Sequence, residues 1–122
     1  MNEKTRILIV EDDEQQRESL HELLTVEGYD VRMASSGNEA IPLIYGVEFD
    51  LVIVDLKMPY IDGFEVLKFI KGTFPKMKVI VLTAYGDLIN IEKCKKLGAD
   101  EVIGKPYNIE YLFSIIEDLL KR

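Results

Sequence analysis

Five short apolar runs, rich in valine and isoleucine, are spaced along the 122 residues of the chain. The first, third and fourth are uninterrupted, as is typical of strands buried on both faces of a parallel sheet. The sequence therefore predicts five strands. The runs cover residues 7–10, 31–34, 51–54, 79–82 and 102–103.

The segments between these runs carry apolar residues at helical spacing, so strand and helix alternate five times. This alternation predicts an α/β fold with right-handed crossovers. Ser36 and Glu39 have capping-box spacing, Gly28 suits a helix end, and Pro42 predicts a kink or an early break in the second helix. The apolar stripes are Leu20, Leu23 and Leu24; Phe64, Leu67 and Ile70; Ile91, Cys94 and Leu97; and Ile109, Leu112, Phe113, Ile116, Leu119 and Leu120.

Polar side chains follow four of the five runs. The carboxyl ends of parallel strands share one edge of the sheet, where ligand sites form. Neighbouring carboxylates repel unless a cation lies between them, and ligands that are all oxygen favour Mg²⁺. A hydroxyl and a lysine suit phosphoryl oxygens, and an aspartate can itself be the nucleophile. The residues are Glu11, Asp12, Asp13, Asp55, Thr83 and Lys105, of which Asp13 is expected to cap the first helix.

Composition narrows the classes of partner. Fifteen Lys and Arg residues against 22 Asp and Glu residues give a net charge of −7, which disfavours nucleic acid and anionic membrane surfaces. No apolar run approaches the length of a membrane span. The chain has one cysteine, Cys94, which therefore cannot form an internal disulfide and is predicted to be a buried thiol. A reducing cytoplasm fits these features.

Five segments, taken together in this order, resemble the receiver domain of two-component response regulators, the family of the chemotaxis response regulator. They are ILIVEDD, DLVIVDLKMPYIDG, VLTAYG, LGAD and KPY. The resemblance implies a flavodoxin-like (βα)5 fold with a doubly wound, five-stranded parallel sheet in the order 2-1-3-4-5. It also implies that residues 1–122 are a single receiver domain, either stand-alone or cut from a longer protein with a C-terminal effector domain.

The resemblance implies a metal site and a phosphoacceptor. Asp55 is similar to the family's phosphoacceptor aspartate. Asp12 would bind Mg²⁺ (or Mn²⁺) directly, and Glu11 would act through water. Lys57 would contribute only its backbone carbonyl to the metal.

The remaining roles concern the phosphoryl group. By resemblance, Thr83 would hydrogen-bond one phosphoryl oxygen, Lys105 would pair with another, and Pro106 would follow a cis peptide bond. The sequence departs from the family at Val102, where an aromatic switch residue is usual. A swinging ring at that position therefore cannot couple Thr83 to the far surface.

The implied function is Mg²⁺-dependent acceptance of a phosphoryl group from a sensor histidine kinase or a phosphotransfer protein. The only reactions expected are the domain's own phosphorylation and dephosphorylation. Output would pass to an effector through the fourth helix, fifth strand and fifth helix. Four apolar residues off the core stripes are candidates for this face: Leu88, Ile89, Tyr111 and Ile115.

Two other classes of protein compete with this interpretation. One is a receiver-like interaction module that is never phosphorylated, against which the intact acidic set argues. The other is a phosphate-transferring enzyme of the haloacid-dehalogenase type, which usually has a second acid two positions after its nucleophile, where this chain has Lys57. A dinucleotide-binding domain is disfavoured because no G-x-G-x-x-G follows the first run.

Overall fold

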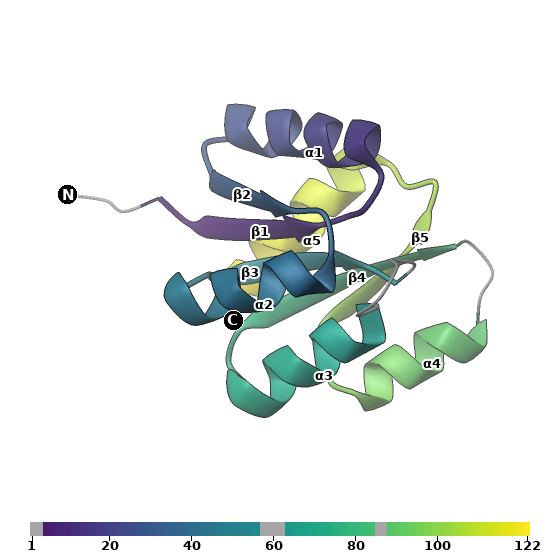
Figure 1. The fold of residues 1–122 in the computed structure, drawn as a ribbon. Coiled ribbons are helices and arrows are strands. Elements are labelled where there is room, and N and C mark those ends of the chain that lie inside the picture. The colour runs from purple at the N-terminus through teal and green to yellow at the C-terminus, as the bar shows by residue number, and fades with distance from the viewer. Residues whose placement is uncertain (1–3, 57–62, 85–87) are drawn as a thin grey trace.

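A computed structural model describes residues 4–56, 63–84 and 88–122 of the chain. It contains one parallel sheet in the order β2-β1-β3-β4-β5, with helices on both faces (Figure 1). The predicted doubly wound order 2-1-3-4-5 is confirmed. The elements are β1 (Arg6–Val10), α1 (Glu14–Val26), β2 (Asp30–Ala34), α2 (Gly37–Gly46), β3 (Leu51–Asp55), α3 (Gly63–Thr73), β4 (Lys78–Ala84), α4 (Leu88–Lys96), β5 (Glu101–Lys105) and α5 (Ile109–Leu120).

The two faces of the sheet are covered by different helices, and each face has its own apolar core. Successive side chains of a strand point to opposite faces. Leu8 and Val10 therefore join the core under α2, α3 and α4, whereas Ile7 and Ile9 join the core under α1 and α5. Burial on both faces explains why the first, third and fourth strands have continuous apolar runs.

The strand register aligns the polar residues at the carboxyl edge. Asp55 pairs with Leu82 across β3 and β4, and Thr83 is the next residue along β4. Lys105 ends β5 opposite Ala84. Beyond the end of β1, the Glu11 N–H donates to the Ala34 carbonyl at 3.1 Å, which extends the pairing with β2 to the first carboxylate.

The helix ends follow the predicted signals, with one change. Asp13 caps α1, and its side chain accepts from the Gln16 N–H at 2.9 Å. Ser36 caps α2 as predicted, but Glu39 reaches back to the N–H and hydroxyl of Ser35, each at 2.6 Å, so the capping box is displaced by one residue.

Three further predictions about helices need correction. No early break occurs at Pro42, since α2 continues through it to Gly46; the proline removes a single N–H donor from the helix. Leu23 is 43% exposed because it borders a surface pocket instead of the core. Ile115 is half-buried and packs against the core under α1 and α5.

Cys94 is fully buried in α4, as predicted. Within the ranges that the structure describes, no helix is both long and apolar enough to cross a membrane.

Candidate functional site

The loop after β1 presents two carboxylates in different surroundings. Glu11 is 4% exposed, and Asp12 is exposed. The Arg17 guanidinium donates to the backbone carbonyl of Glu11 at 2.9 Å, while the Asp13 cap fixes the start of α1. These contacts hold the loop so that the Glu11 side chain is buried at the carboxyl edge of the sheet and the Asp12 side chain faces solvent.

Asp55 and Lys105 meet across β4, although they end strands that are not neighbours in the sheet. Asp55 is 8% exposed, and its Oδ2 accepts from the Lys105 Nζ at 2.7 Å. The same ammonium donates to Glu11 Oε1 and to Gln16 Oε1, each at 2.8 Å. An ammonium has three N–H donors, so each of them has an acceptor.

The site's electrostatics follow from burial and from these contacts. Burial raises the pKa of Glu11 from 4.5 to about 7; the hydrogen bond from Lys105 opposes the rise, and the Asp55 carboxylate adds to it. Burial by itself lowers the pKa of Lys105, but hydrogen bonds and ion pairs with Asp55 and Glu11 outweigh it and raise that pKa. The site therefore carries excess negative charge that one lysine only partly offsets.

Glu11, Asp12 and Asp55 form a group that fits a hard divalent cation. Each offers a carboxylate oxygen, and these oxygens lie within 4.8 Å of one another. Carboxylate oxygens are the protein ligands that Mg²⁺ prefers, so these three residues would hold the ion and offset the repulsion between their charges. Asp12 is exposed, so water would have access to the ion from that side.

The other predicted residues have different outcomes. Thr83 is 3% exposed at the end of β4, and the Lys105–Pro106 peptide bond is cis. Val102 is half-buried in β5 and packs against the core under α2, α3 and α4. Lys57 lies outside the described residues.

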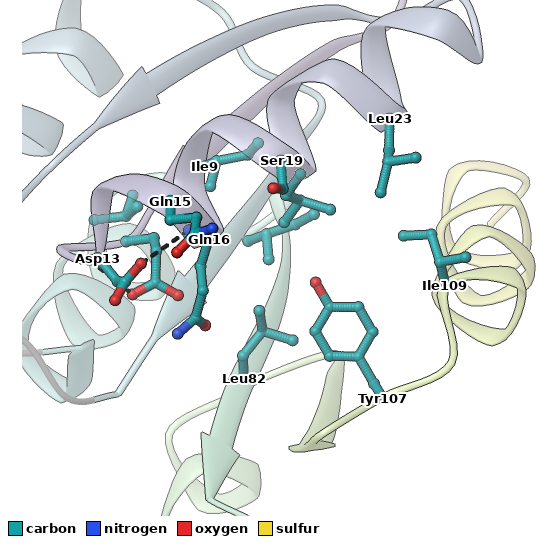
Figure 2. A pocket seen from close by; sticks show the side chains of 13 residues that line it. Ile9, Asp13, Gln15, Gln16, Ser19, Leu23, Leu82, Tyr107 and Ile109 are labelled. Carbon is teal, nitrogen blue, oxygen red and sulfur yellow. Dashed lines mark hydrogen bonds between the residues drawn. The ribbon is translucent and has the colours of Figure 1, made fainter.

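A pocket of about 470 Å³ lies beside the carboxylates, between α1 and the start of α5 (Figure 2). Glu11 and Gln16 border it at one end, and Leu23 and Ile109 border it elsewhere. The Tyr107 hydroxyl points toward α1 in Figure 2, and burial raises the pKa of this phenol. No local pattern of residues indicates this pocket, because segments far apart in the chain form it.

Comparison with known proteins decides the family. A sequence profile described as the response regulator receiver domain matches residues 7–117. The chain belongs to the response regulator receiver domain family. Two-component signalling is therefore the setting in which this receiver domain acts.

Individual relatives agree with the family assignment. The receiver domain is 38% identical to sporulation initiation phosphotransferase F of Bacillus subtilis, over 98% of this chain and 95% of that protein. It is 38% identical to the response regulator MprA of Mycolicibacterium vanbaalenii, over 96% of this chain but only 51% of that protein, so it spans about half of that relative. A solved structure of TrrA from Thermotoga maritima, in complex with Mg²⁺ and BeF, has a TM-score of 0.86 and 36% identity over 94% of this chain and 98% of that one.

Two residues of the receiver domain's site were not predicted from the sequence as site residues. The Gln16 side chain accepts a hydrogen bond from Lys105. Its position in the first turn of α1, directly after the acidic loop, could have marked it in the sequence as a residue near the site. Gly63 begins α3 directly behind Asp55: a Cβ on it would lie 2.5 Å from the Asp55 carbonyl oxygen and 2.6 Å from the Leu56 Cα. Sequence reasoning could not identify this role, because the contact between the start of α3 and the end of β3 exists only in the folded chain.

Glu11 predicts how the stability of the receiver domain depends on pH without metal. Its pKa of about 7 lies above its ordinary 4.5, so between these values the folded chain holds a proton that the unfolded chain has lost. This contribution to stability is complete below the unfolded pKa and is lost as the pH rises through the folded pKa. Between about pH 5 and about pH 8 in EDTA, we expect the wild type to lose on the order of 2 kcal/mol relative to Glu11→Gln.

Urea unfolding of both proteins over this pH range checks the expectation. The difference in stability between the wild type and Glu11→Gln isolates Glu11, because the titration of the other acids is common to both proteins and cancels. Parallel stability curves would mean that Glu11 titrates normally in the folded protein.

Proposed function

We propose that this receiver domain accepts a phosphoryl group on Asp55 in a Mg²⁺-dependent step, with a phosphohistidine of a sensor histidine kinase or a phosphotransfer protein as donor. The observation that carries the proposal is the contact of Asp55 Oδ2 with the Lys105 ammonium at 2.7 Å, inside the carboxylate group of Glu11, Asp12 and Asp55. A nucleophile, a cation for the phosphoryl oxygens and ligands for a divalent ion are thus together.

The step forms a bond between an Asp55 carboxylate oxygen and phosphorus. It breaks the P–N bond of the phosphohistidine and leaves the electron pair on the imidazole nitrogen. Bound Mg²⁺ (or Mn²⁺) would neutralise charge on the phosphoryl oxygens, held by Glu11, Asp12, Asp55 and the backbone carbonyl of Lys57. The chain's own contribution is to hold the Asp55 carboxylate in place and to offer the Lys105 ammonium to the transferred group. In this proposal the domain promotes only its own phosphorylation and dephosphorylation.

The phosphoryl group then acts as a charge switch. It adds roughly −1.5 to −2 charge. The Lys105 ammonium would pair with one of its oxygens and the Thr83 hydroxyl with another, favouring one of two conformations. Because Val102 is a small aliphatic residue packed in the core, the change would reach the surface without a swinging aromatic ring at that position.

We place the output surface on α4, β5 and α5, where it would bind a downstream effector. Leu88 and Ile89 at the start of α4 are 72% and 83% exposed, and Tyr111 on α5 is 50% exposed. Such exposure of large apolar side chains supports an interaction surface. Ile115 belongs to the edge of the core instead, so its contribution to this surface would be small.

We also propose that residues 1–122 form one receiver domain and that it acts in the cytoplasm. The matched profile over residues 7–117 supports the single domain.

The proposal is tested with acetyl phosphate as a small-molecule donor. With Mg²⁺, the wild type is expected to take up about one phosphoryl group per chain, in an acid-stable and base-labile linkage typical of an acyl phosphate. With EDTA in place of Mg²⁺, uptake is expected to fall to background. A chain that takes up nothing under either condition would be an unphosphorylated interaction module.

The metal ligands can be tested with two adjacent acids. Asp12→Asn is expected to weaken Mg²⁺ binding at least about tenfold, because it removes the charge of one carboxylate ligand. Asp13→Asn is the matched control, since asparagine is also a good N-cap and Asp13 lies outside the carboxylate group. Mg²⁺ titration followed by the rise in melting temperature measures both variants. Equal weakening in both variants would contradict the assignment of Asp12.

A further inference from the structure

Gln16 is held at the border between the pocket and the carboxylates. Its backbone N–H donates to the Asp13 cap at 2.9 Å, so its position in the first turn of α1 is fixed. Its side chain extends from α1 toward Leu82 at the carboxyl end of β4 (Figure 2). There its Oε1 accepts from the Lys105 Nζ at 2.8 Å.

The three acceptors of the Lys105 ammonium are not equivalent. Glu11 and Asp55 belong to the carboxylate group that fits a divalent cation, and Asp55 is also the proposed phosphoacceptor. A cation drawn to these carboxylates would compete with the ammonium for their oxygens. The Gln16 amide is neutral and lies outside that group, so its oxygen remains available to Lys105 when metal is bound.

We propose that Gln16 is a positioning residue for phosphoryl transfer: its amide oxygen keeps the Lys105 ammonium directed at Asp55 while the carboxylates are engaged by Mg²⁺. This inference rests on the proposed function of the same site. Lysine has a long, flexible side chain, and its ammonium contributes to transfer only if it is held where charge develops. Gln16 supplies that restraint through one hydrogen bond.

Gln15 provides a matched control on the same turn of α1. It is exposed and borders the same pocket as Gln16, but the Lys105 ammonium has its three acceptors elsewhere. Methionine has nearly the length and the helix propensity of glutamine, and it lacks the amide. Gln16→Met therefore removes the acceptor with little change in shape, and Gln15→Met makes the same change without touching Lys105.

The experiment measures phosphorylation by acetyl phosphate at saturating Mg²⁺. For Gln16→Met we expect a limiting rate about 3- to 10-fold below that of the wild type, which corresponds to the net contribution of one ordinary intramolecular hydrogen bond. The Mg²⁺ concentration for half-maximal rate should change by less than about twofold, because Gln16 is not a ligand. Gln15→Met should match the wild type in both quantities.

A spectroscopic readout separates positioning from a general effect on folding. At saturating Mg²⁺, the ¹H–¹⁵N signal of the Lys105 ammonium should be sharp in the wild type, broadened in Gln16→Met, and restored in Gln16→Glu, which keeps an acceptor oxygen at this place. An unchanged limiting rate or an unchanged ammonium signal in Gln16→Met would overturn the inference, as would an equal loss in Gln15→Met. If the wild type itself takes up no phosphoryl group, the proposed function fails first, so the two failures are distinguishable.

Discussion

Asp55→Asn is expected to abolish phosphoryl uptake from acetyl phosphate and Mg²⁺. An asparagine amide is not a nucleophile that can form an acyl phosphate. Among the described residues, the other carboxylate that contacts Lys105 is Glu11, which lies in the loop after β1 and not at the end of β3. The variant should still fold, because asparagine has the same shape and keeps an oxygen that can accept from the Lys105 ammonium. Label uptake, with circular dichroism to show that the chain is folded, measures the effect.

Asp50→Asn is the control for this experiment. Asp50 precedes β3 at the opposite end of the strand, where its side chain accepts from the Arg6 N–H at 2.9 Å. We expect this variant to take up label like the wild type. If Asp55→Asn were labelled as well as the wild type, another residue would be the acceptor.

Gly63→Ala is expected to have the largest effect on stability among the substitutions considered. The added Cβ would lie 2.5 Å from the Asp55 carbonyl oxygen and 2.6 Å from the Leu56 Cα, and both are backbone atoms that cannot rotate away. The Gly63 N–H also donates to the Leu56 carbonyl, so α3 begins in direct contact with the end of β3. We expect a loss of about 1–3 kcal/mol or more, as for overpacking of a core.

The same substitution should also slow phosphorylation, since the backbone that must shift carries Asp55. Gly72→Ala is the matched control on the same helix, because a Cβ there would meet nothing within 4 Å. Alanine is the better helix former, so this control should gain up to about 1 kcal/mol. Urea unfolding and acetyl phosphate kinetics measure both variants. Equal stability of the two would contradict the close approach at Gly63.

The fold was largely predictable because its determinants are local in sequence. Continuous apolar runs such as residues 51–54 indicate strands covered on both faces, and the polar residue after each run indicates the edge where a site forms. Thr83 and Lys105 were predicted in this way, and the structure places each at the carboxyl end of its strand. The strand order itself came from the resemblance to a family.

What was missed depends on the distances between segments that are remote in sequence. The contact of Gln16 with Lys105 joins residues 89 positions apart, and nothing in either local sequence specifies it. Leu23 shares the helical stripe of Leu20 and Leu24, yet it borders the pocket between α1 and the start of α5 and is not part of the core. The early break predicted at Pro42 does not occur, because the cost of one missing hydrogen bond is small compared with the packing that holds α2 on the sheet.

Chemical location of the phosphoryl group decides whether Asp55 is the acceptor. The chain is phosphorylated with acetyl phosphate and Mg²⁺, reduced with borohydride, which converts an aspartyl phosphate to homoserine, and digested for mass spectrometry. We expect homoserine at Asp55 and at no other acid of the site. Homoserine at Asp12 or Asp13, or none in a chain that has taken up phosphate, would contradict it.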